Sequence, residues 1–205
     1  MSEATHAHAV HRDDFGARLG MWLFLVTEMV LFGGLFIAYS YMRSKYPAEF
    51  HHAGAELNAT LGITNTLVLL TSSLTVVLAI VAIQRGDRRK TMAFLATTLG
   101  LGLVFLVIKS FEWATKFHHG LYPNSAHLAT LPHGEQVFFG LYFTMTGLHG
   151  LHVIAGLSVL GYMLRMVAKG EITQDRYVHL ENGGLYWHLV DVIWIFLLPL
   201  FYLAA

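Results

Sequence analysis

Five stretches of this chain are long and apolar enough to cross a lipid bilayer as α-helices. They cover approximately residues 19–42, 61–83, 91–117, 136–166 and 184–204. A helix needs about 20 apolar residues to cross a hydrocarbon layer about 30 Å thick, and a helix satisfies all of its own backbone hydrogen bonds there. A membrane β-barrel requires alternating apolar and polar residues, and these stretches do not alternate. We therefore predict an all-α integral membrane protein, a bundle of five transmembrane helices.

Outside these stretches little sequence remains for a second domain. Hydrophobic residues make up 55% of the 205 residues and charged residues only 13%, whereas soluble domains carry about 25% charged residues. We divide the chain into a polar N-terminal tail, 1–18, and a single membrane domain, 19–205. The tail lacks the apolar core and cleavage site of a signal peptide. Its His6, His8 and His11 either take up adventitious metal or belong to a solvated, disordered segment.

Composition and motifs exclude several functions. The formal net charge is zero, so no nucleic-acid partner is expected. The chain has no Cys, which excludes disulfides, thiolate metal sites and cysteine nucleophiles. It also lacks the motifs of common hydrolases, zinc proteases and nucleotide-binding loops. We expect no catalytic site in this chain.

The distribution of Lys and Arg predicts the orientation of the bundle. With the N-terminus inside, nine of these residues fall on inner segments and four on outer ones. Positive charge accumulates on the cytoplasmic side of membrane proteins, so we predict the N-terminus inside and the C-terminus outside. The longest connection, 118–135, then lies on the outer face.

One acid interrupts the first apolar stretch. Glu28 follows residue 19 by about 14 Å along a helix, which places it near the middle of the hydrocarbon layer. An ionised carboxylate is costly there, so it must be protonated, paired or hydrated. We expect Glu28 to be neutral, because the sequence places no obvious cation at its depth. Intramembrane acids are commonly functional, and the alternative is a neutral acid hydrogen-bonded to a neighbouring helix.

Other polar residues inside the apolar stretches occur three positions apart, which places them on one helix face. The pairs are Lys109 with Glu112, His149 with His152, and His188 with Asp191, while Glu181 precedes the last stretch. We expect the first pair to lie towards the outer end of its helix.

The spacing alone leaves the role of the histidines open. His149, His152 and His188 are candidate ligands of a b-type haem, with Asp191 as a partner of His188. The Glu-x-x-His pattern of di-iron bundles is missing. The other reading is a polar network that ties helices together. At this level the chain suits a proton-handling or complex-stabilising subunit, a haem-binding anchor, or a small transporter, although the broken helices of transporters are not apparent.

Four ordered motifs narrow the choice. They are MWLFLVTEMVLFGGLFIAY, NTLVLLTSSLTVVLA followed by RGDRR, FFGLYFTMTGLHGLHVIAG, and ENGGLYWHLVDVIWIFLLPLFYL. Together they resemble subunit III of haem–copper terminal oxidases, and the resemblance covers nearly everything after residue 18. Larger members of that family have seven helices, so this chain is similar to a short, five-helix form.

The resemblance implies a role without redox chemistry. Members of the family bind no haem, copper or other metal; subunits I and II hold those groups. Subunit III packs beside subunit I, holds phospholipids and supports proton uptake in aerobic respiration. This would place the chain in a bacterial cytoplasmic (inner) membrane, within an oxidase and possible respiratory supercomplexes. We expect the complex to be a cytochrome c oxidase. The alternatives are that the chain is subunit III of a quinol oxidase, or a haem-b-binding membrane anchor of another respiratory complex.

The resemblance also implies roles for the polar residues. Glu28 would lie near the subunit I interface or a lipid cleft. A packing and hydrogen-bond network would include His149, His152, Glu181, His188 and Asp191. Lys109 and Glu112 would pair near the outer surface.

Overall fold

The computed structural model describes residues 14–203 as a bundle of long α-helices. The membrane helices are α1 (Asp14–Lys45), α3 (Ala59–Gln84), α4 (Arg88–His118), α5 (His133–Lys169) and α6 (Val178–Leu198), the last continued by a π-helical turn, Pro199–Leu203. Each is long and apolar enough to cross a membrane, so the predicted five-helix bundle is confirmed. The tail histidines and residue 204 lie outside the described residues.

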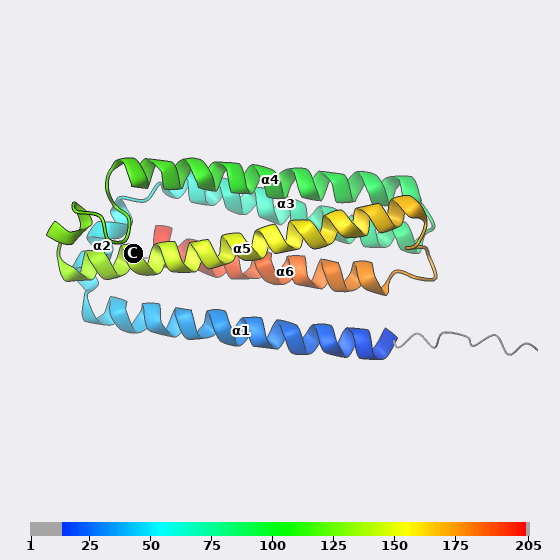
Figure 1. The fold of residues 1–205 in the computed structure, drawn as a ribbon, viewed down its shortest axis with the longest axis horizontal. Coiled ribbons are helices and arrows are strands. Elements are labelled where there is room, and N and C mark those ends of the chain that lie inside the picture. Colours follow the sequence, from blue (N-terminus) through cyan, green and yellow to red (C-terminus); the bar gives the residue numbers. More distant parts are fainter. Residues whose placement is uncertain (1–13, 204–205) are drawn as a thin grey trace, which may run out of the picture.

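The five helices run side by side along one axis (Figure 1). The α3–α4 pair forms one side of the bundle, α5 and α6 lie next to it, and α1 packs on α5 and α6 at the opposite side (Figure 1). Only 11% of the apolar window of α1 is buried, against 56% for α6. Helix α6 is therefore the centre of the bundle, and α1 presents most of its apolar surface outward.

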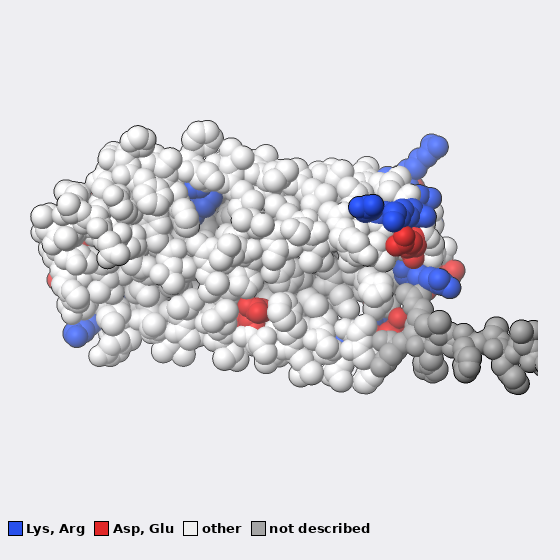
Figure 2. Space-filling model, viewed as in Figure 1, with Lys and Arg blue, Asp and Glu red and all other residues white. Residues whose placement is uncertain are grey.

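Most of the charged side chains visible in Figure 2 gather at one end of the bundle, where α1 begins. We call the end where α1 begins the basic end; its residues include Arg18, Arg85, Arg88, Arg89, Lys90, Lys169 and Arg176. Apart from one acidic and one basic patch, the flank between the ends is free of charge in Figure 2, as a surface in contact with lipid or with another membrane subunit would be. The inside location of the basic end stays a prediction.

Local signals set the helix ends. Asp87 begins α4 because its Oδ1 accepts a hydrogen bond from the Lys90 backbone N–H at 3.1 Å, which satisfies a free donor of the first turn. The Lys90 ammonium lies 2.8 Å from Oδ2, and these hydrogen bonds lower the pKa of Asp87 below 3.8. Gly170 ends α5 with φ 80°, a left-handed conformation that glycine adopts without strain.

The helices extend beyond the predicted apolar stretches. Helix α1 includes residues from Asp14 onward, inside the segment expected as a tail. The connection after α1 contains a short helix, α2 (Pro47–Ala55), and the 118–135 connection contains a 3-10 turn, Leu128–Thr130. These elements were missed because they are too short to show apolar periodicity.

Trp187 of α6 fills the centre of the bundle. Its ring is fully buried between glycines of two neighbouring helices: a Cβ on Gly102 of α4 would lie 2.9 Å from the ring, and one on Gly156 of α5 would lie 2.8 Å from it. The Nε1–H donates to Ser72 Oγ of α3 at 3.0 Å. One side chain therefore sets the distances between four helices.

Candidate functional site

The intramembrane acid meets a histidine. Glu28 Oε2 of α1 lies 2.9 Å from His152 Nε2 of α5, and both side chains are about 15% exposed or less. Counted from the basic end of α1 and of α5, the two residues lie at similar depth. The sequence prediction that no cation lies near Glu28 therefore missed His152, which can carry a positive charge.

The geometry fixes the tautomer of His152. Its Nδ1 lies 2.8 Å from the Leu148 carbonyl oxygen, and a carbonyl can only accept, so Nδ1 carries a proton. The Nε2–Oε2 hydrogen bond then holds one proton. It belongs either to the Glu28 carboxyl, beside a neutral imidazole, or to an imidazolium beside a carboxylate. The pair is a proton-holding contact that joins α1 to α5.

A second polar cluster lies towards the other end of the bundle. Lys109 Nζ lies 3.1 Å from Glu112 Oε2, and it donates to the hydroxyls of Tyr142 at 3.0 Å and Tyr202 at 2.6 Å. Both tyrosines donate to Glu112 Oε1, at 2.7 and 2.5 Å. The ion pair is buried in the bundle, and its donors and acceptors satisfy one another. It joins α4, α5 and the C-terminal turn, which is a structural role.

His149 is fully buried and has no hydrogen-bond partner on either ring nitrogen within the described chain. Its ring stacks on Trp194 with 5.2 Å between centroids, and the Phe105 ring lies nearly perpendicular to it, at 83°. The ring is thus held by aromatic packing. Although it lies three positions from His152, it takes no part in the contact with Glu28.

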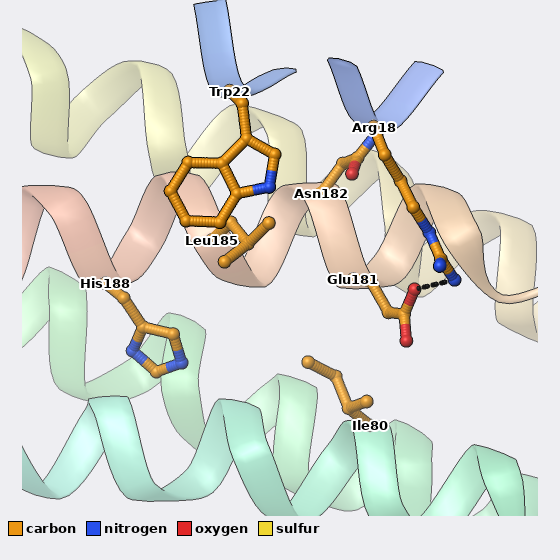
Figure 3. Close-up of a pocket in the computed structure, with 7 residues that line it drawn as sticks. All are labelled: Arg18, Trp22, Ile80, Glu181, Asn182, Leu185 and His188. Carbon is orange, nitrogen blue, oxygen red and sulfur yellow. Dashed lines mark hydrogen bonds and ion pairs between the residues drawn. The ribbon is translucent and has the colours of Figure 1, made fainter. Parts of the chain in front are cut away.

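A cavity of about 380 Å³ opens between α1, α3 and α6 near the basic end (Figure 3). Arg18 donates to Glu181 Oε2 at 2.8 Å, and this ion pair forms one end of the cavity (Figure 3). His188 lies at the other end, with Ile80 and Leu185 on the walls between. Glu181 therefore serves α1–α6 packing at the basic end and does not contact the histidines of α5.

His188 lines this cavity, and Asp191 follows it by one turn of α6. His188 Nδ1 lies 2.6 Å from Ser73 Oγ of α3 and 3.9 Å from Asp191 Oδ2. Asp191 is 3% exposed. The predicted polar residues thus lie in separate contacts and do not form one continuous network. Among residues 14–203, no three His, Asp or Glu side chains are arranged to hold a metal ion.

Several partners in these contacts carry no sequence signal. Ser73, Tyr142, Tyr202 and Arg18 come from other helices than the residues they bind. Only Lys109 with Glu112, and His188 with Asp191, are local pairs that helical spacing can indicate.

Comparison with known protein families identifies the family of this chain. The model of the family described as "Cytochrome c oxidase subunit III" matches residues 1–205. The chain belongs to this subunit III family.

Individual subunit III relatives agree with the match. A cytochrome c oxidase subunit 3 of Thermostichus vulcanus is 34% identical and aligns over 97% of this chain and 92% of its own length. One from Alkalihalophilus pseudofirmus is 33% identical over 91% of this chain and 86% of its own. A "Heme-copper oxidase subunit I+III" of Aeropyrum pernix is 29% identical over 91% of this chain, which matches 22% of that longer protein.

Proposed function

We propose that this chain is the non-catalytic subunit III of a proton-pumping cytochrome c oxidase, in which it stabilises subunit I, holds lipid and supports proton uptake. The observation that carries the proposal is the family match over residues 1–205. The relatives at 33–34% identity carry the name cytochrome c oxidase, which favours cytochrome c over quinol as the electron donor.

Direct packing beside subunit I is supported by the Aeropyrum pernix relative, whose name joins subunits I and III in one chain. Segments fused in one chain stay close together. The largely apolar flank of the bundle (Figure 2) is suitable for such a contact inside the membrane, because charged groups are costly there. Subunit II and larger respiratory assemblies are further partners in this proposal.

Lipid binding is supported by a groove of about 300 Å³ between α1, α5 and α6. Met21, Phe24, Val159 and Tyr186 are among its lining residues. Because the lining is almost entirely apolar, the groove suits the acyl chain of a phospholipid.

The haems and copper belong to the partner subunits in this proposal. The three histidines that spacing offered as ligands are engaged elsewhere: His152 with Glu28, His188 with Ser73, and His149 in a stack on Trp194. Because each ring has a different partner, these contacts support a chain in which the three histidines do not share one haem.

We place the protein in a bacterial cytoplasmic membrane. The relatives from Thermostichus vulcanus and Alkalihalophilus pseudofirmus, at 34% and 33% identity, support this location. Support for proton uptake comes from the Glu28–His152 contact, since it holds one proton inside the membrane.

The proposal can be tested by purifying the oxidase from cells with and without this chain. Without it, haem content per subunit I should be unchanged, whereas the melting temperature, the bound phospholipid and the rate of proton uptake should fall. Equal values of all three in the two preparations would contradict the proposal.

A further inference from the structure

Asp191 is the least satisfied acid in the described chain. Its carboxyl is buried, and neither oxygen makes a hydrogen bond of normal distance and angle. A buried carboxylate without a partner is strongly disfavoured, and an unsatisfied buried acceptor also carries a cost. In this position a carboxyl therefore binds a proton.

The groups around Asp191 offer one route for that proton. His188 lies one turn earlier on α6, and its Nδ1 is 3.9 Å from Asp191 Oδ2, too far for a direct hydrogen bond. Ser73 belongs to α3 and faces α6, where its Oγ lies 2.6 Å from the same Nδ1 of His188. The neighbouring Ser72 is already engaged by Trp187. Ser73 also interacts with the Asp191 carboxyl, so its hydroxyl is the one placed to bridge the gap.

His188 also connects this buried pair to the basic end. Its side chain is 32% exposed and faces the cavity between α1, α3 and α6 (Figure 3). The far end of that cavity is formed by the charged side chains of Arg18 and Glu181, which are 51% and 26% exposed. Polar groups thus stand at both ends, and about 380 Å³ is ample room for water.

We propose that Asp191, Ser73 and His188 form a proton-binding site that exchanges with water at the basic end through this cavity. On release, the Asp191 O–H bond breaks and its proton passes to Ser73 Oγ, while the Ser73 hydroxyl proton moves to His188 Nδ1. The Nε2 proton of His188 then leaves to cavity water. The site ends with an Asp191 carboxylate, a neutral imidazole and one hydronium, and uptake is the reverse. The inference concerns this chain alone and does not rest on its proposed role in an oxidase.

The test is infrared spectroscopy of the full-length protein in the complex with which it purifies, before and after transfer to D₂O. We expect a protonated-carboxyl band that Asp191→Asn removes and Glu28→Gln leaves in place. The band should shift in D₂O. An Asp191 that absorbs as a carboxylate, or a band that does not shift, would overturn the proposal.

Variants that block the cavity distinguish exchange through the cavity from exchange by any other solvent route. Leu185→Trp fills the cavity and should slow the D₂O shift several-fold, whereas Ile195→Trp, on the exposed face of the same helix, should not. Ser73→Ala should keep the band and also slow its shift. These variants retain Asp191, so the test holds even if Asp191→Asn fails to fold. Equal exchange rates in all three and the wild type would overturn the route.

Discussion

At the scale of single residues, the Glu28–His152 hydrogen bond fixes how α1 attaches to α5. Glu28→Gln should preserve assembly, because an amide N–H can donate to His152 Nε2. Glu28→Ala leaves that nitrogen without a partner and should cost about 1–3 kcal/mol of stability. Thermal unfolding of the purified protein in mild detergent measures the difference. Equal melting temperatures for the two variants would show that the hydrogen bond does not stabilise the bundle.

The Lys109–Glu112 pair calls for a double-mutant cycle. Lys109→Met alone should destabilise by about 3–5 kcal/mol, because it leaves a buried charge without its counter-ion. Adding Glu112→Gln removes that charge, so the double variant should lose less than the sum of the two single variants. Additive losses in thermal or denaturant unfolding would mean that the two side chains do not interact energetically.

Residue contacts were predictable from the sequence only where they are local. Lys109 and Glu112 are three positions apart, so helical spacing places them on one face. Glu28 and His152 are 124 positions apart, and nothing in either segment alone indicates that α1 lies on α5. The same holds for Ser73 and His188, which belong to different helices.

At the scale of helices, the glycines around Trp187 are a test of packing. Gly156→Ala should lower stability by about 1–3 kcal/mol, because overpacking forces the neighbouring side chains to shift and the Trp187 ring lies 2.8 Å from the new Cβ. Gly161→Ala is the matched control on the same helix, since its Cβ would meet no atom within 4 Å. A similar melting temperature for both variants would contradict the central placement of Trp187.

The stability of the first turn of α4 should depend on pH. Hydrogen bonds from Lys90 lower the pKa of Asp87, so the carboxylate stabilises the first turn above the unfolded pKa, and this contribution is lost as pH falls through the folded value. Amide hydrogen exchange at Lys90, corrected for intrinsic rates, should therefore be faster in acid. Asp87→Asn, which keeps a capping oxygen but has no charge, should remove this dependence. An unchanged pH profile in Asp87→Asn would refute the explanation.

The helices themselves were predictable because a membrane requires long apolar segments, and α3 and α4 follow those segments closely. The ends were less predictable. Helix α1 includes Asp14, and α5 continues to Lys169 before the left-handed Gly170, so both reach beyond the apolar stretches. Helix α2 has nine residues and too few apolar positions to be distinguished from a loop.

At the scale of the whole molecule, α1 is the helix least covered by the chain itself. A partner subunit or lipid must therefore cover its apolar face in the membrane. This agrees with a chain that functions in a complex.

The most direct test is affinity purification of the tagged chain in mild detergent, with mass spectrometry and a haem spectrum. The account predicts that a haem-containing oxidase subunit co-purifies and that this chain is colourless after it has been stripped from the complex. A chain that purifies without an oxidase partner, or that keeps haem when isolated, would contradict the account.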